Sequence, residues 1–233
     1  MLITYRSQSD RRLLNRADPA YWHPAYGRLL EAVAHPLARL GDFITHITYG
    51  PIIVGRKLPT ASGQPALALV NQGQLGDAGV DLRGAAVIPP GCDWDRPSAR
   101  VQRGDLLIAS SGVGSLGRNR LAVFFQDCPA VVGSFVDLVR LEGLDSVYVA
   151  LFLKTRYGWG QIHRLINGVA VPNVSFEEIR QLRIAVAPEG LQQELRGTYL
   201  QAILPLHNDH DPRVTELHRA LVARTEGLLQ SRP

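Results

Sequence analysis

The spacing of apolar residues changes along this chain, and each change predicts a different kind of structure. Between residues 25 and 33 the spacing is i, i+3, i+4 and i+7, which places the apolar side chains on one face of a helix. These side chains are Tyr26, Leu29, Leu30 and Val33. We expect the helix to end at His35-Pro36, because a residue before proline disfavours the α conformation. Residues 1–39 are therefore predicted to be a helical lead-in.

From residue 41 to residue 143 the apolar residues form short runs, and glycine or proline recurs between them. The runs are rich in valine, isoleucine and leucine, and they span residues 43–49, 52–54, 66–70, 85–88, 105–110, 121–125 and 134–141. Short strands at such close spacing, with turn residues between them, are typical of an all-β barrel or sandwich. Alternating β and α units would show longer helical segments between the strands.

Helical signals return after residue 144. Asp145 is a good N-cap for a helix, and we expect Gly158-Trp159-Gly160 to interrupt helical structure before a further turn that Asn167-Gly168 closes. Ser175-Phe176-Glu177-Glu178 has the pattern of a capping box, which predicts the start of another helix. A strand at residues 183–187 completes this region.

Residues 189–233 predict two helices with a polar break between them at residues 207–212. The apolar stripe of the first helix is Leu191, Leu195, Leu200 and Leu204. The second stripe has roughly heptad spacing and consists of Val214, Leu217, Leu221 and Leu228. Such a pair, outside the β-rich body, suggests packing against another helix in the same chain or in a partner. The predicted fold class is α+β, with a lead-in at 1–39, a β-rich barrel-like or sandwich-like domain at 40–188 and a C-terminal helical segment at 189–233.

Charge and composition permit nucleic-acid binding without showing it. The chain has 25 lysines and arginines and 21 acidic residues, so its net charge of +4 is small. Lys57 and Lys154 are its only lysines, and arginine supplies the rest. The planar guanidinium grips phosphate or guanine through two hydrogen bonds, which suits contact with nucleic acid. A GC-rich genome, which favours arginine, alanine, leucine and glycine together, would give the same composition.

The sequence predicts a cytoplasmic protein that spans no membrane. It contains no run of about 18 apolar residues, and its first residues lack the apolar stretch of a signal peptide. Cys92 and Cys128 lie outside any CxxC pattern, which favours two inert thiols over a disulfide or a zinc site.

One motif has the spacing of a cofactor site but not the context. Gly112-Val113-Gly114-Ser115-Leu116-Gly117 is a GxGxxG sequence, and Asp137 lies about 20 residues further on, as in a dinucleotide-binding turn. A β-rich run at 118–125 follows it, however, where that fold requires a helix whose N-terminus holds the pyrophosphate. A glycine turn between two strands is the better interpretation.

Other enzyme patterns find no support. Neither lysine is preceded by the Glu-x or Gln-x of common metal-dependent nucleases, and Pro89-Pro90 lacks the flanking residues of a methyltransferase loop. His207 and His210, with a neighbouring aspartate, could bind a metal, but a solvated turn is the preferred interpretation. Ser110-Ser111-Gly112 lacks the flanks of a nucleophile elbow. We therefore expect no catalytic site, no cofactor and no metal.

Several weak motifs nevertheless follow one another in a characteristic order. They are Arg16-Ala17-Asp18-Pro19-Ala20-Tyr21-Trp22, Leu40-Gly41-Asp42, Gly104-Asp105-Leu106-Leu107 with the glycine turn at 114–117, the helix at 145–153, Gln161 and Gly168, and the stretch from Asn173 to Pro188 followed by Gln192 or Gln193. This order, over residues 16–205, resembles the target-recognition domain of type I restriction–modification specificity subunits. Complete subunits of that family usually carry two such domains, and this chain has room for one. It would then be a half-subunit that pairs with itself, or the recognition domain of a related single-chain or split system.

The resemblance implies a specific role. The chain would hold double-stranded DNA and recognise its sequence, while a separate DNA methyltransferase subunit flips and methylates adenine, with a restriction subunit as a further partner. It implies a β-rich domain with flanking helices and a helical spacer. The C-terminal stripes would bind the methyltransferase or a second copy of the chain, and a homodimer would present two recognition surfaces.

Arginine and amide side chains near turns of the β-rich region are the candidate DNA contacts, because arginine pairs with guanine, and asparagine or glutamine with adenine. The first choice is Arg118-Asn119-Arg120, directly after the glycine turn. The other candidates are Thr45, His46, Thr48, Tyr49, Arg56 and Lys57 around the first strands, Gln72 and Gln74 in the next turn, and Arg156, Tyr157 and Gln161 as contacts to the DNA backbone.

Two other classes of protein stay open. A protein–protein adaptor would dock on a methyltransferase or defence complex without reading DNA, and it would lack a basic surface around residues 45–57 and 118–120. A barrel that binds RNA or single strands would need exposed aromatic residues on one strand face, for which the candidates are Tyr49, Phe124 and Phe125.

Overall fold

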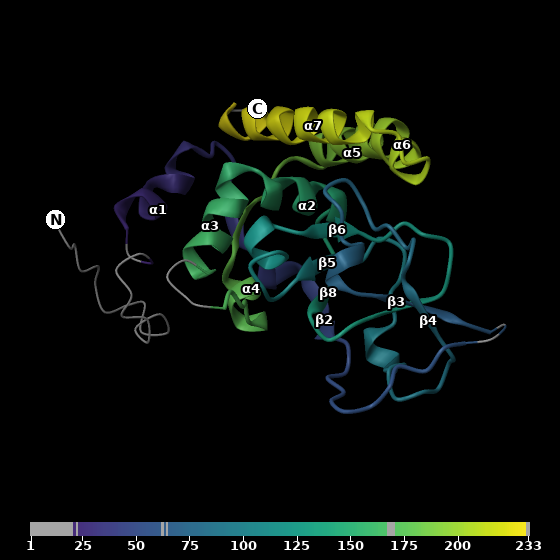
Figure 1. Ribbon diagram of the computed structural model, residues 1–233. Helices are drawn as coiled ribbons and strands as arrows, with labels where there is room; N and C mark the ends of the chain where they lie inside the picture. Colours follow the sequence, from purple (N-terminus) through teal and green to yellow (C-terminus); the bar gives the residue numbers. More distant parts are fainter. Residues whose placement is uncertain (1–20, 22, 62, 64, 167–170, 232–233) are drawn as a thin grey trace.

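A four-stranded antiparallel sheet lies at the centre of the fold (Figure 1). Its strands lie in the order β2 (Ile44–Tyr49), β8 (Val136–Leu141), β5 (Leu106–Ala109) and β6 (Leu121–Val123). The computed structural model describes residues 21, 23–61, 63, 65–166 and 171–231. The predicted α+β class is confirmed, because helices pack on this sheet from one side and a second sheet packs on it from the other.

Both faces of β5, β6 and most of β8 are buried, whereas the edge strand β2 is partly exposed. Side chains alternate between the two faces along a strand. Leu106 and Ile108 of β5 therefore lie in one hydrophobic core with the helices, whereas Leu107 and Ala109 lie in a second core. A strand that is buried on both faces is apolar throughout, which explains why the sequence of β5 shows no alternation of polar and apolar residues.

The second sheet covers one face of the first. It consists of β4 (Ala86–Ile88), β3 (Leu67–Val70) and β7 (Ala130–Val132), with β3 and β4 antiparallel and β3 and β7 parallel. Its side chains share the second core with Leu107 and Leu138 of the central sheet. The predicted sandwich-like arrangement is confirmed, while the barrel alternative is wrong, because neither sheet closes on itself.

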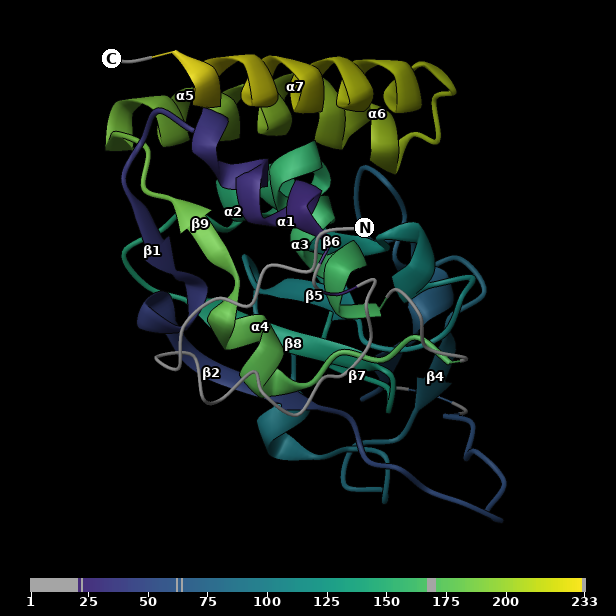
Figure 2. The same cartoon turned by 90° about the vertical axis from the view of Figure 1, so that its left-hand side faces the viewer.

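Helices cover the other face of the central sheet (Figure 2). They are α2 (Ser146–Lys154), α3 (Arg156–Ile166) and α4 (Phe176–Gln181), with α1 (Pro24–Arg28) and a 3-10 helix at Leu29–Ala32 beside α3. Asp145 caps α2 as predicted, since its Oδ1 accepts hydrogen bonds from the backbone of Val147 and Tyr148 at 2.9 and 3.0 Å. The capping box at Ser175 also forms at the start of α4.

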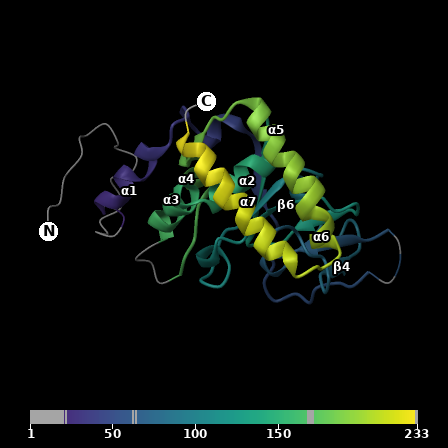
Figure 3. The same cartoon turned by 90° about the horizontal axis from the view of Figure 1, so that it is seen from above.

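The C-terminal helices run antiparallel to each other over α2 (Figure 3). The first arm is α5 (Glu189–Thr198), a π-helical turn at Tyr199–Ile203 and α6 (Leu204–Asn208), and the second arm is α7 (Arg213–Gln230). The predicted pair and its polar break are confirmed. Leu195, Leu204 and Leu221 are buried in this chain's own core, whereas Leu217 is 40% exposed. The boundaries at residues 39 and 188 stay predictions.

The sequence pattern did not predict two short strands, β1 and β7. β1 (Leu37–Arg39) pairs antiparallel with β9 (Arg183–Ala185) and so joins the lead-in to the end of the β-rich region. β7 is also only three residues long. A strand of three residues gives no measurable periodicity, and its position is decided by a partner that is distant in the sequence.

The structure corrects two expectations about local structure. Residues 52–54 form no strand, and Ile52 and Val54 are 61% and 86% exposed. Gly158-Trp159-Gly160 does not interrupt a helix, because α3 runs through it and the break lies at Thr155. A Cβ atom on Gly158 would lie 2.3 Å from the Cα of Leu153, so this glycine lets α2 and α3 approach closely. The closing turn predicted at 167–168 and the motif residues 16–20 and 22 lie outside the described residues.

Residues of the motif series fasten the layers to one another. The carboxylate of Asp105, which is 2% exposed, accepts two hydrogen bonds from Arg140 of β8 at 2.8 and 2.7 Å. Asp145 forms an ion pair with Arg196 of α5 at 2.7 Å, and its backbone N–H donates to Gln192 at 2.9 Å. The bonds of Asp105 join neighbouring strands of the central sheet, and those of Asp145 join the start of α2 to the C-terminal arm.

The carboxyl group of Asp137 is buried in the central sheet. It lies on β8 with 2% exposure, and among the described residues no group donates a hydrogen bond to its Oδ2. Burial raises the pKa of Asp137 to about 7, against a smaller lowering by a hydrogen bond with Ser110.

We expect Asp137→Asn to stabilise the protein above pH 7 and to change little near pH 4. The folded state keeps this proton up to about pH 7, whereas an unfolded chain releases it near 3.8. The unfolded state therefore binds fewer protons between these values, and the stability of the natural protein falls as the pH rises through them. The gain at pH 8 should reach a few kcal/mol, at most about 4. Urea unfolding at pH 4.5 and pH 8 measures it, and an equal difference at both values would contradict the expectation.

Candidate nucleic-acid interface

Several turns meet at one end of the central sheet. β5 ends where β8 begins, because Ala109 pairs with Val136, and β2 ends beside them, because Tyr49 pairs with the next residue of β8. β3 ends on the same side, where Val70 pairs with Val132. We call this region the loop end, and its turns are residues 50–57, 71–74, 110–120 and 133–135.

Phe135 projects from the loop end on a backbone that hydrogen bonds hold in place. Its carbonyl oxygen accepts from the backbone N–H of Ser110 and from Nε2 of Gln72, both at 3.0 Å. The same Nε2 donates to the carbonyl of Ser111 at 2.9 Å, so one amide ties three turns together. The side chain of Phe135 is nonetheless 53% exposed. A large aromatic ring that is exposed on a fixed backbone is a candidate contact for another molecule.

Glycine makes this close meeting of turns possible. The N–H of Gly133 donates to the carbonyl of Val70 at 2.8 Å, and its own carbonyl accepts from Gly50 at 3.1 Å. A Cβ atom on Gly133 would lie 2.0 Å from Oδ1 of Asn71, and one on Gly50 would lie 1.9 Å from the carbonyl oxygen of Val132. The loop end is therefore packed backbone against backbone.

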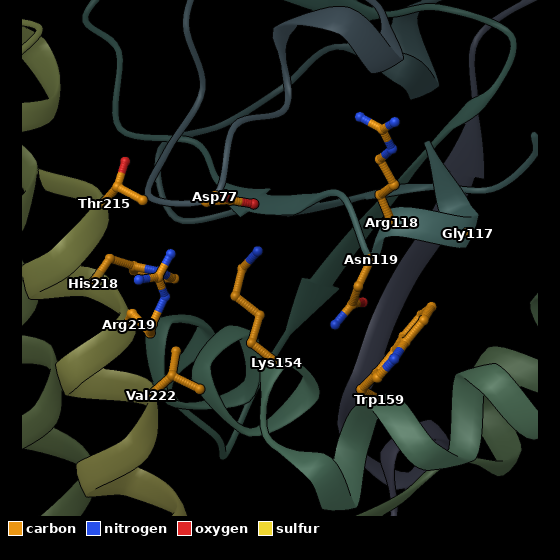
Figure 4. Close-up of a pocket in the computed structure, with 10 residues that line it drawn as sticks. All are labelled: Asp77, Gly117, Arg118, Asn119, Lys154, Trp159, Thr215, His218, Arg219 and Val222. Atoms are coloured by element: carbon orange, nitrogen blue, oxygen red, sulfur yellow. The ribbon is translucent and has the colours of Figure 1, made fainter. Parts of the chain in front are cut away.

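The structure separates the three residues that were the first choice for DNA contact. Asn119 has a left-handed backbone (φ 52°) and donates from Nδ2 to the carbonyl of Leu153 at 2.9 Å, so it fixes the turn against α2. Arg120 lies at the loop end, where Nη1 is 3.5 Å from the carbonyl oxygen of Gln72. Arg118 is exposed and lines a different surface, a groove beside α7 (Figure 4).

The glutamines of the turn at 71–74 hold the structure. The side-chain amide nitrogen of Gln72 donates hydrogen bonds to the carbonyls of Ser111 and Phe135. Gln74 accepts from the backbone N–H of Asn71 at 3.0 Å and so completes a capping box. Both are half-buried, and neither is free to form the bidentate contact that adenine requires.

The candidates on β2 differ in exposure. Thr45 is exposed and donates to the carbonyl of Arg140 at 3.3 Å, while His46 contacts the carbonyl of Ser98 at 2.7 Å. Thr48 is buried at 6%. Tyr49, at the loop end, is 37% exposed and stacks on Phe176 of α4, with ring centroids 5.5 Å apart. Of these four residues, Tyr49 has the position of a contact at the loop end.

Beyond β2 the chain presents charged and apolar side chains together. Arg56 forms an exposed ion pair with Asp93, and Lys57 is exposed. An exposed pair of this kind contributes little to stability. Ile52 and Val54 project beside them.

The three candidates on α3 have structural partners. Tyr157 is only 1% exposed, so we leave it out of the candidate surface. Gln161 donates to and accepts from the backbone of Arg183 at 2.8 and 2.7 Å, which joins α3 to β9. Arg156 is exposed but pairs with Glu226 of α7 at 3.2 Å.

Sequence reasoning missed Phe135, Lys154 and Arg219. The available signal for Phe135 is its position directly after Gly133-Ser134, which is typical of a turn, although the sequence pattern predicts a strand at 134–141. Lys154 and Arg219 come together from α2 and α7, and no local pattern joins residues so far apart in the sequence.

Three findings bear on other possible functions. In the part of the chain that the structure describes, no three histidine, cysteine or acidic side chains lie close enough together to hold a metal ion. No described helix has both the length and the apolar character that a membrane crossing requires. The GxGxxG segment lies between β5 and β6, as the strand–turn–strand interpretation predicted.

Comparison by sequence finds no matching family model and no matching curated protein. Comparison by structure finds specificity subunits of type I restriction–modification systems, the family that the order of motifs resembles. The HsdS subunit from Thermoanaerobacter tengcongensis matches at a TM-score of 0.48 and 15% identity over 95% of this chain, and the S subunit from M. genitalium at 0.49 and 13% over 90%. A chain from a type I R-M system, studied for its complex assembly and conformational transition, matches at 0.49 and 14% over 94%.

A further match is the type IIG restriction endonuclease BpuSI, at a TM-score of 0.57 and 8% identity over 96% of this chain. At this identity the likeness shows a common fold and nothing about activity. The chain spans 48 to 53% of the three type I chains and 35% of BpuSI.

We expect Gly133→Ala to destabilise the protein by about 1–3 kcal/mol, because the new methyl group would push Asn71 and its turn away from the turn at 133–135. Gly114→Ala is the matched control, since its Cβ would meet nothing within 4 Å, and its effect should stay within about 1 kcal/mol. Chemical denaturation of both variants measures the difference. Equal stability of the two would show that the loop end is not tightly packed.

Proposed function

We propose that this chain recognises a specific double-stranded DNA sequence through the loop end, as a specificity subunit with a single target-recognition domain. It would direct a separate DNA methyltransferase, in a complex with or without a restriction subunit, and perform no catalysis itself. The order of motifs supports the family, and the arrangement of Arg120, Phe135 and Tyr49 at one rigid end of the sheet supports the surface.

The observation that carries the proposal is that Gln72 connects Arg120 and Phe135. The carbonyl of Gln72 accepts from Arg120, and its side-chain amide donates to the carbonyl of Phe135. The side chain of Arg120 has five N–H donors, and the one hydrogen bond that it makes within the described residues, to the carbonyl of Gln72, is long at 3.5 Å. Most of its hydrogen-bonding capacity is therefore available for the O6 and N7 atoms of guanine. Phe135 beside it offers an apolar surface to a thymine methyl group or a wedge between base steps.

Other exposed residues would hold the DNA backbone. Arg56 and Lys57 lie in the turn of the loop end that follows β2, and Arg118 lies in the turn that follows β5. Such contacts set affinity and register, whereas Arg120 and Phe135 would set the sequence. Gln72, Gln74 and Asn119 act in this proposal by holding the turns in place.

An enriched motif that contains guanine is the expected outcome when the protein selects from a randomised duplex pool at near-physiological salt. Arg120→Ala should relax the guanine position and cost about 1–3 kcal/mol of discrimination. Phe135→Ala should weaken the motif at a neighbouring position without altering binding to unrelated DNA. Sequencing of the bound fraction and titration of the selected duplex measure both effects.

Arg103→Ala is the control, because Arg103 is an exposed arginine at the opposite end of β5 that pairs with Asp127 at 2.8 Å. It should leave the motif unchanged. Enrichment of no sequence by the protein alone or with a methyltransferase subunit would reject base recognition. Retained binding to that subunit would then favour the adaptor, whose docking surface the exposed apolar residues of the loop end would supply.

The C-terminal arms carry the partner in this proposal. The apolar stripes of these helices are largely buried in this chain's own core. The methyltransferase would therefore bind their outer, mainly polar face, where Leu217 is exposed. We therefore expect a monomeric mass at micromolar concentration by light scattering, since a homodimer would find little apolar surface there. A dimer that Leu217→Glu dissociates would instead support self-association through these helices.

A further inference from the structure

A groove of about 380 Å³ lies between α7 and the turn at 117–119 (Figure 4). Thr215, His218, Arg219 and Val222 line it from α7, and Lys154 rises from the end of α2 between the two sides. Asp77 and Trp159 complete its border. The groove is separate from Arg120 and Phe135, although Arg118 of the same turn as Arg120 borders it.

The charges in this groove do not balance. Arg118, Lys154 and Arg219 are cationic, and Asp77 is the single carboxylate among the lining residues. His218 adds no charge at neutral pH, because burial, with a smaller contribution from Lys154, lowers its pKa to about 3. Burial lowers the pKa of Lys154 to about 8 in spite of Asp77, so this ammonium group keeps its charge near pH 7 in a partly desolvated position.

The side chains of Arg118 and Arg219 are exposed on opposite sides of the groove, and no ion pair joins either of them to a carboxylate in the described part of the chain. Elsewhere in the described part of the chain the arginines at 83, 100, 103 and 213 each have an aspartate partner. An anion in the groove would receive charge-assisted hydrogen bonds from Arg219 and Lys154, and from Arg118 once its exposed side chain, which points away from Lys154 in Figure 4, turns toward the groove.

We propose that this groove binds a phosphate group, held by Arg118 and Arg219 with Lys154 beneath it. The volume accommodates more than the phosphate itself, and the ring of Trp159 borders the remaining space. A phosphate of a DNA backbone and a free nucleotide share this chemistry. If the phosphate belongs to DNA, α7 touches the duplex with its groove side and leaves its outer side for a protein partner. The inference does not depend on base recognition at the loop end.

The test uses the full chain with three probes: a duplex of unrelated sequence, adenosine monophosphate and inorganic phosphate. Arg219→Ala and Arg118→Ala are compared with Arg213→Ala, which removes an equal charge from the first turn of α7, where Arg213 pairs with Asp211. Fluorescence anisotropy at several salt concentrations measures duplex binding, and calorimetric titration measures the small anions.

We expect each groove variant to weaken binding to the unrelated duplex by roughly 3- to 10-fold at low salt and to reduce the salt slope by about one. The Arg213→Ala control should stay close to the natural protein. Binding of adenosine monophosphate or phosphate that both groove variants lose would assign the site to a free anion, which also supports the proposal. Duplex and anion binding that match the control in both groove variants would overturn it.

The same variants separate this inference from the proposed function. Arg219→Ala should still select the motif that the natural protein selects, only with lower affinity, because phosphate contacts carry no sequence information. Loss of unrelated-duplex binding in the groove variants, without any motif selected by the natural protein, would uphold the groove and reject base recognition.

Discussion

Burial of the central sheet on both faces is the constraint on which the rest of this structure depends. Every side chain of β5 lies in a hydrophobic core, one shared with the helices and one with the second sheet. Polar side chains on these strands must therefore be paired, as Asp105 is with Arg140, or bear the cost of desolvation, as Asp137 does. This sheet can present polar groups at low cost along its partly exposed edge strand β2 and at its ends, and the turns of four strands gather at one end.

Apart from the glycine turn at 114–117, the described motifs that carry the family resemblance lie in the supporting structure and not on the proposed contact surface. Asp105 clamps β8, and Asp145 caps α2 while it binds the C-terminal arm. Gln161 joins α3 to β9. Such residues can be read from sequence order because the frame needs them at set distances along the chain. Residues that would read DNA need only project from the turns, and their identity can vary without altering the frame.

The same division applies within the loop end and the groove. The side-chain amides of Gln72, Gln74 and Asn119 form hydrogen bonds with backbone groups, which makes the turns rigid. The side chains of Arg118 and Phe135 are exposed to solvent, and that of Arg120 is half-buried. A rigid support lowers the entropy lost on binding, so the polar bonds that remove three candidates from direct contact would strengthen the contacts of Arg120, Phe135 and Arg118.

The sequence by itself determined the class of the fold, its strands at residues 67–70, 86–88 and 106–109, the caps at Asp145 and Ser175 and the helix pair that follows Pro188. These features depend on neighbours within a few residues, where periodicity and capping act. Tertiary structure alone decided the β1–β9 pair, the parallel pairing of β3 with β7, the burial of Tyr157 and the meeting of Lys154 with Arg219. Each of these depends on contacts between segments far apart in the chain, which become fixed only when both faces of the central sheet are covered.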